Sequence, residues 1–183
     1  DTYGMLDWDA NILYDITWRS SAQFSMRLRR QYTFLINGFD PSGTGGIPLP
    51  ANSEYTNNVI IARYQSDERK KLSYELSTRS GDYFNGKRWT LEGSIQWRYQ
   101  PLSFTSIDFA YNGIRLPDDY NDAKLFLIGP RFDFTFSKSL FWTTYVQYNS
   151  QIDNVNINSR LQWRFAPVSD FFLVYTDNYL ADN

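Results

Sequence analysis

The stretch WTLEGSIQWRY, residues 89–99, places one kind of side chain at odd positions and another kind at even positions. Trp89, Ile95 and Trp97 belong to the odd series, whereas Glu92 and Arg98 belong to the even series. Because successive side chains of a strand point to opposite faces, this alternation predicts a β-strand with one apolar and one polar face. A shift of register by one residue would exchange the two faces, so the pairing of this strand is well specified.

The same alternation recurs along the rest of the chain. In residues 154–165, Ile157 and Trp163 fall in one series, and Asn158 and Arg164 fall in the other. Further strands are predicted at residues 10–19, 22–34, 57–66, 71–80, 103–112, 126–136, 140–149 and 170–178. The chain thus contains about ten predicted strands, most of them near the ~9–11 residues with which a tilted strand crosses a bilayer.

The composition separates two classes of β-protein. Phe, Tyr and Trp make up 19% of the residues, yet the mean hydropathy is −0.51. Outer-membrane barrels combine these properties, because one face of each strand meets lipid, the other meets a wet lumen, and aromatic rings collect at the interfaces. We therefore predict an all-β, antiparallel, up-and-down transmembrane β-barrel in the outer membrane of a Gram-negative bacterium. The alternative is a soluble sandwich or lipocalin-like barrel, whose apolar face would point inward.

The predicted connections favour the membrane interpretation. Short links are predicted at residues 20–21, 67–70, 101–102, 137–138 and 166–169, and longer links at 38–56, 81–87, 113–122 and 150–153. Short and long links alternate, as do the periplasmic turns and extracellular loops of outer-membrane barrels. The longest link is rich in glycine and proline, which disfavour regular structure, so we predict that it is an extracellular loop.

Four tryptophans lie close to the predicted short turns, namely Trp18, Trp97, Trp142 and Trp163. Each of them belongs to the apolar series of its strand. An indole at a membrane interface buries its ring and keeps its N–H near water. We therefore predict that these residues form the membrane-interface aromatic girdle on the periplasmic side.

The polar series carries charged residues of both signs. The candidates for a lumen-facing surface are Arg27, Arg29, Glu92, Arg98, Arg131, Asp133, Arg160 and Arg164. One interpretation is a selectivity surface for a polar or anionic solute, to which the arginines would contribute. The other interpretation is that these groups only pair with one another and with water along the barrel wall.

Several other classes of protein find no support. The longest uninterrupted apolar run, residues 125–128, is far shorter than the roughly 20 residues of a membrane-spanning helix. The chain has no Cys and no His, so we predict no enzyme activity of the familiar outer-membrane types, no cofactor and no metal site. The net charge of −2 disfavours nucleic-acid binding, which needs a concentrated basic surface.

Three stretches carry a resemblance to a known family, namely SLFWTTYVQYN (139–149), NINSRLQWR (156–164) and DFFLVYTDNY (170–179). From Phe104 onward the chain is similar to the C-terminal region of a Bacteroidota-type outer-membrane family of unknown function. Longer members of that family resemble a carbohydrate-binding module of the family-nine type joined to a C-terminal β-barrel. The resemblance implies location and architecture, and it transfers no catalytic or binding residues.

Residues 1–183 are expected to form one incomplete barrel segment. The last predicted strand runs outward without a returning partner, and a final barrel strand usually ends in an aromatic residue, so we expect strands beyond the C-terminus and before the N-terminus. The first hypothesis for function is a pore or a gated channel or receptor for polar solutes. The alternative is a structural or accessory subunit of a larger outer-membrane transport or secretion complex. The expected partners are outer-membrane lipid and subunits of such a complex.

Overall fold

The structure is a computed structural model that describes residues 4–117 and 119–180. Its ten β-strands begin and end close to the predicted positions. They are β1 (Asp7–Thr17), β2 (Gln23–Leu35), β3 (Ser53–Gln65), β4 (Leu72–Tyr83), β5 (Gly86–Tyr99), β6 (Ser103–Arg115), β7 (Ala123–Thr135), β8 (Leu140–Asn149), β9 (Asn154–Ala166) and β10 (Ser169–Leu180).

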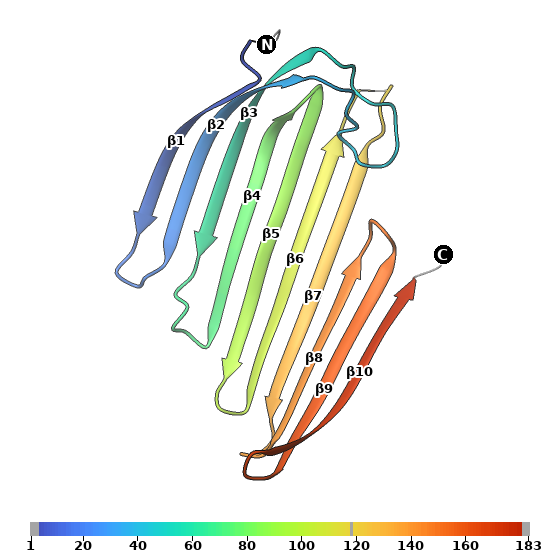
Figure 1. The fold of residues 1–183 in the computed structure, drawn as a ribbon. Helices are drawn as coiled ribbons and strands as arrows, with labels where there is room; N and C mark the ends of the chain where they lie inside the picture. Colours follow the sequence, from blue (N-terminus) through green and yellow to red (C-terminus); the bar gives the residue numbers. More distant parts are fainter. Residues whose placement is uncertain (1–3, 118, 181–183) are drawn as a thin grey trace. The chain divides into compact units, whose positions relative to one another are not determined.

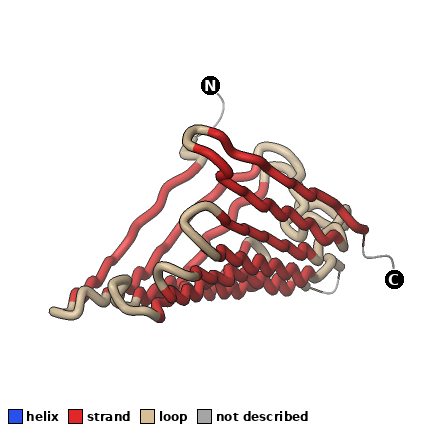
Figure 2. Tube along the Cα trace, turned by 90° about the horizontal axis from the view of Figure 1, so that it is seen from below, coloured by secondary structure: helices blue, strands red, loops and turns tan. Residues whose placement is uncertain are grey.

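The strands form one antiparallel sheet in which each strand pairs with its neighbours in the sequence, in the order β1 to β10. In Figure 1 neighbouring arrows run in opposite directions from the blue to the red end of the chain. The described residues consist of strands and loops, as Figure 2 shows, and none of them forms a helix able to span a membrane. The predicted all-β, up-and-down topology is therefore confirmed.

One predicted connection is wrong. Residues 81–87 were expected to form a long link, but β4 continues to Tyr83 and β5 begins at Gly86, so that only Phe84 and Asn85 connect the two strands. Phe84 adopts a positive φ of 52°, which closes the tight turn. Short and long links therefore do not alternate throughout, and the predicted orientation of the sheet loses part of its support.

The reason for this difference is that Gly81 belongs to the strand. Its φ is +153°, and a Cβ at this position would lie only 2.2 Å from the backbone oxygen of Asn58 in β3. Asp82 then accepts a hydrogen bond of 2.9 Å from the backbone N–H of Asn58. A glycine that resembles a loop residue in the sequence thus permits a close approach of two backbones within the sheet.

The register aligns side chains of one kind across neighbouring strands. In the sheet formed by β7 to β10, Phe134 lies opposite Trp142, Trp142 opposite Leu161, and Leu161 opposite Leu173. Directly opposite residues share a face, so these four apolar side chains form one row across the sheet. A second row on the other face begins with Arg131 and continues through Tyr145, Asn158 and Thr176.

The chain divides into two compact units. The amino-terminal unit comprises Asp1–Tyr64, Leu76–Leu91 and Tyr111–Lys124, and the carboxy-terminal unit comprises Gln65–Glu75, Glu92–Ala110 and Leu125–Asn183. Buried apolar residues are few among those described, and all belong to the amino-terminal unit: Ala22, Leu49, Val59, Ile114, Leu116 and Ala123. Leu49 belongs to loop 36–52 and Leu116 to loop 116–122, and Ile114 and Ala123 flank the second loop.

Candidate functional site: two faces of one sheet

The apolar face of the sheet is widely exposed. On β5, the exposed fractions of Trp89, Ile95 and Trp97 are 45%, 43% and 56%. By contrast, the polar-series residues Thr90 of β5 and Ser73 of β4 are only 5% and 4% exposed. Small polar side chains are thus covered while large apolar side chains are open, which reverses the usual pattern of a water-soluble domain.

The face prediction has exceptions at the two outer strands. Leu13 of β1 lies opposite Arg27 in the polar series, and more than half of its surface is exposed. On β10, Phe172 and Val174 lie opposite Gln162 and Arg160 of the polar series. These three apolar residues therefore lie on the face that the sequence pattern predicts to be polar.

In the amino-terminal unit, the predicted lumen-facing residues Arg27 and Arg29 lie on β2 in the same series. Arg29 lies opposite Asn11, and its Nε is 3.7 Å from the Asp9 carboxylate. At that distance the contact is an ion pair without a hydrogen bond, and the Arg29 Nε has no hydrogen-bond partner.

In the carboxy-terminal unit, charged groups of the polar face pair locally. Arg131 Nε and Asp133 Oδ2 are 2.9 Å apart on the same strand, and Arg164 Nε and Asp170 Oδ1 are 3.1 Å apart across β9 and β10. Arg160 lies with its guanidinium carbon 5.9 Å from the centre of the Phe172 ring. The structure thus brings Arg131 and Asp133 together as a pair but does not gather all predicted residues into one cluster.

The remaining two predicted residues of the polar face lie on β5. Arg98 donates hydrogen bonds through Nη2 to the backbone oxygen of Glu68 and to Ser73 Oγ, and its Nε is buried without a partner. These contacts tie Arg98 to the turn between β3 and β4. Glu92 is exposed and has no hydrogen bond or ion pair with another described residue.

A polar network that the sequence analysis missed joins β5 and β6. Arg88 donates from Nη2 to Asn112 Oδ1 over 2.7 Å, and Thr90 donates to the same oxygen over 2.8 Å. Arg88 also lies over the Tyr83 ring, with 5.3 Å between its guanidinium carbon and the ring centre. The even-numbered positions of residues 88, 90 and 112 could have indicated this network once the pairing of the strands was known.

The four predicted girdle tryptophans are all exposed. Trp18 contacts Tyr64 with ring centres 6.2 Å apart, and Trp163 contacts Phe165 with ring centres 5.8 Å apart. Trp142 donates its indole N–H to Ser159 Oγ over 2.8 Å, whereas Trp97 keeps more than half of its surface open. Each tryptophan lies near a connection that follows an odd-numbered strand, as the sequence predicts, and their membrane role stays a prediction.

Loop 36–52 is folded around one carboxylate. Asp40 accepts hydrogen bonds from the backbone N–H groups of Ser42, Gly45 and Gly46, at 2.9, 2.9 and 3.1 Å, and from the Ser42 hydroxyl. The Ser42 hydroxyl is the main reason that the pKa of Asp40 is lowered, and the three backbone donors lower it further. The loop also contacts loop 116–122, because Asn121 donates to Thr44 Oγ1 over 3.2 Å.

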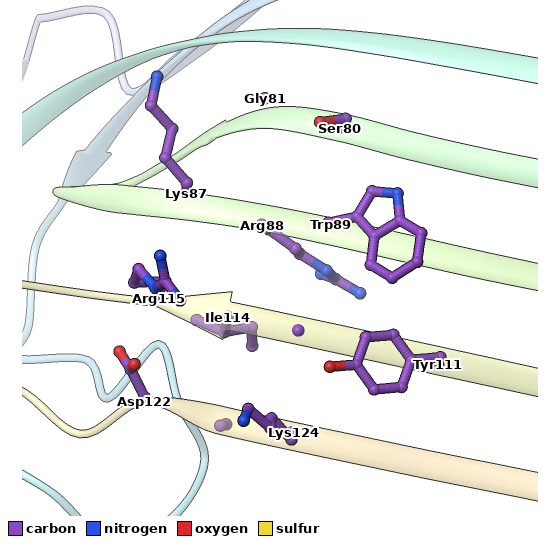
Figure 3. A pocket seen from close by; sticks show the side chains of 12 residues that line it. Ser80, Gly81, Lys87, Arg88, Trp89, Tyr111, Ile114, Arg115, Asp122 and Lys124 are labelled. Atoms are coloured by element: carbon purple, nitrogen blue, oxygen red, sulfur yellow. The ribbon is translucent and has the colours of Figure 1, made fainter.

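A cavity of about 540 Å³ opens on β4 to β7 within the amino-terminal unit. Trp89 and Tyr111 form one part of its wall, with ring centres 5.3 Å apart and planes inclined by 56°. In Figure 3 the cationic side chains Lys87 and Arg115 lie at a distance from these two rings, toward the ends of their strands. Lys87 pairs with Asp82, and Asp122 accepts the backbone N–H of Leu116 over 2.8 Å.

The described residues contain no group of three or more acidic, His or Cys side chains that could hold a metal ion. Comparisons with known proteins were equally without result: no family model, no curated protein and no solved structure matches the chain. The resemblance to the Bacteroidota-type outer-membrane family therefore stays a prediction that rests on the quoted stretches alone.

Proposed function

We propose that this chain forms part of the wall of a β-barrel in the outer membrane of a Gram-negative bacterium, and that the barrel is a pore or gated channel for polar solutes. The observation that carries the proposal is the wide exposure of large apolar side chains on one face of the sheet. Apolar surface in water costs roughly 25 cal/mol per Å², whereas the same surface against hydrocarbon carries no such cost. A row such as Phe134, Trp142, Leu161 and Leu173 is therefore suited to lipid.

The soluble alternative makes a different demand on the same residues. A sandwich or lipocalin-like barrel would cover the apolar face with a second layer or with the opposite wall. Ile12, Ile60 and Ile95 would then be buried, but each is more than two-fifths exposed, and no described residue forms a covering layer. The membrane interpretation needs no such layer, although it requires a pairing partner for the free edges of β1 and β10.

The polar face supports passage of polar solutes. Its charged groups have both signs, and pairs such as Arg131 with Asp133 remain partly exposed. Such a surface can exchange hydrogen bonds with water and with a solute without removing a bare charge from solvent. The chain's own residues would thus provide a hydrated wall, and the identity of the solute would depend on which groups line the narrowest part.

Site-directed spin labelling tests the membrane part of the proposal. The sequence contains no cysteine, so Ile95→Cys and Gln96→Cys each give one labelled position on opposite faces of β5. In reconstituted vesicles, we expect oxygen to relax the label at 95 more strongly and a water-soluble nickel chelate to relax the label at 96 more strongly. The reverse order, or equal access of the chelate to both positions, would contradict the proposal.

Planar-bilayer recordings test the transport part. A purified barrel that contains this chain and the strands that close it should give discrete conductance steps. Arg131→Gln should shift its ion selectivity toward cations, because the substitution removes one positive charge from the polar face. Lys138→Gln is the matched control, since it removes a cation from the turn between β7 and β8 without changing that face. A correctly inserted protein that conducts no ions would count against a pore.

An accessory role is the second candidate, and β10 supplies the observation that favours it. Phe172 and Val174 expose 49% and 56% of their surface on the otherwise polar face. A water-filled lumen would leave both side chains in water, whereas a partner segment would cover them. Stable co-purification of a partner in mild detergent, lost in a Phe172→Gln variant, would support this role, and a protein that purifies alone would contradict it.

A further inference from the structure

Four cations lie in the apolar series of the amino-terminal unit, where the proposed function gives them no role: Arg30, Lys87, Arg115 and Lys124. Lys87 is two residues from Trp89, and Arg115 is four residues from Tyr111, so each shares a face with an aromatic residue. All four cations are exposed. A cation on a lipid-facing surface is costly at the bilayer centre and tolerated near the interface. Lys87, Arg115 and Lys124 lie within two residues of a strand end, whereas Arg30 lies inside β2.

Three acidic groups of the same region are already engaged. Asp82 pairs with Lys87, Asp122 accepts the Leu116 N–H, and Glu54 accepts the Tyr32 hydroxyl over 2.9 Å. The side chains of Arg115 and Lys124 make no hydrogen bond or ion pair with any other described residue. The same is true of Arg30. The side chains of Arg30, Arg115 and Lys124 therefore have no acidic partner among the described residues.

The cavity beside these cations continues into an apolar groove. Arg115 and Lys124 line the cavity of about 540 Å³, and Ser80 and Gly81 line both this cavity and a groove of about 520 Å³. Ile12, Leu28 and Ile60 form the apolar wall of the groove. Small side chains at 80 and 81 thus leave room for one elongated molecule with a charged end and an apolar end.

We propose that this surface binds a membrane lipid whose headgroup carries a phosphate, with the phosphate beside Arg115 and Lys124 and one acyl chain along Ile12, Leu28 and Ile60. The inference rests on the proposed function, because it places the apolar face in a bilayer. A guanidinium and an ammonium suit phosphate oxygens, the first as a planar fork and the second as a point charge. Trp89 and Tyr111 would lie at the depth where headgroup and chain meet, which amphipathic rings favour.

The test uses the full chain in dodecyl maltoside micelles, titrated with phosphatidylglycerol or with phosphatidylcholine, each brominated on one acyl chain. Bromine quenches nearby tryptophan fluorescence, and Trp89→Phe identifies the part of the signal that comes from the proposed site. We expect tighter binding of phosphatidylglycerol at this site. Arg115→Gln combined with Lys124→Gln should weaken the binding by about fivefold for each cation removed.

Two controls accompany the double variant. Lys138→Gln removes a cation from a turn of the carboxy-terminal unit and should leave the lipid preference unchanged. Lys124→Arg retains the charge and should retain most of the preference. Because both substituted positions are exposed, the far-ultraviolet circular dichroism of the double variant should match that of the parent. Should the double variant fail to fold, Lys124→Gln alone must still lower the preference about fivefold.

The outcomes separate this inference from the proposed function. Equal binding of the two lipids would overturn the phosphate site and leave the membrane proposal intact. Absence of quenching by either lipid would overturn both. Inorganic phosphate added at a concentration equal to that of phosphatidylglycerol should not displace the lipid, and complete displacement would overturn the lipid as the ligand in favour of free phosphate.

Discussion

The two faces of β5 carry different side chains, and these differ in how far they are exposed. On one face, Ile95 and Trp97 are large, apolar and open. On the other face, Thr90 is covered, and Arg98 is held by the turn between β3 and β4. This difference is the one that the membrane proposal predicts, because a strand in water would be expected to cover its apolar side chains and expose its polar ones.

The largest expected effect comes from moving a charge between these faces. Ile95→Arg places a cation on the apolar face, and we expect it to lower the free energy of unfolding by about 2–4 kcal/mol in lipid vesicles. Gln96→Arg, one residue further on the polar face, should change this quantity by less than about 1 kcal/mol. Urea unfolding monitored by tryptophan fluorescence measures both values.

This pair of variants tests directly which face of β5 tolerates an added charge. Should Gln96→Arg be the more damaging change, the polar face would be the packed one and the soluble alternative would gain support. Equal effects would mean that neither face is in contact with hydrocarbon.

A second, smaller effect is expected from adding one methyl group to the apolar face. A Cβ at Gly93 would lie 2.6 Å from Phe109 Cζ and 2.9 Å from the backbone oxygen of Glu75. Gly93→Ala should therefore destabilise the protein by about 1–3 kcal/mol through overpacking. Ser94→Ala, the adjacent change on the polar face, should have an effect near zero, and a neutral Gly93→Ala would show that the Phe109 ring moves aside freely. The same unfolding assay compares the two.

The faces could be predicted from the sequence because they depend on neighbouring positions of one strand. Trp89 and Thr90 point to opposite sides whatever strand lies beside them. The ten strands could be located for the same reason. The position of Gly81 could not be predicted, since its role depends on the approach of Asn58 from another strand. A glycine next to an aspartate resembles a loop in one dimension, and only the pairing of β3 with β4 identifies it as part of the sheet.

The candidate site was predicted less completely than the fold. Arg29 lies opposite Asn11, and Arg164 lies opposite Asp170. These partners depend on the register of the paired strands, and the alternation of apolar and polar residues alone does not determine the register. The cations Arg115 and Lys124 were missed because they lie outside the predicted strands, which β6 and β7 extend in the structure. They lie together only because β6 and β7 are neighbours. Phe172 on the polar face likewise departs from a pattern that holds for the inner strands.

A third variant measures how easily the polar face accepts a change of charge. Asp133→Asn removes one partner of an ion pair whose two side chains are 51% and 27% exposed, so the loss of stability should be only about 0.2–1 kcal/mol. Phe132→Asn, on the apolar face of the same strand, should cost more, because it places an amide in contact with lipid. A larger loss for Asp133→Asn would indicate that the Arg131 pair is shielded from water.

The smallest effect on stability should come from loop 36–52. This loop belongs to neither face of the sheet, so a change in it should leave both faces unaffected. The pKa of Asp40 is lowered in the folded loop by the Ser42 hydroxyl and by backbone N–H groups, so the carboxylate stabilises the loop above the ordinary Asp pKa of 3.8. This contribution is lost as the pH falls through the lower, folded pKa. The Gly45 and Gly46 amides should then lose protection from hydrogen exchange, corrected for intrinsic rates, while the amides of β5 keep theirs. Asp40→Asn should remove this pH dependence, and a variant whose Gly45 and Gly46 amides still respond to acid as the parent does would place the titrating group outside the loop.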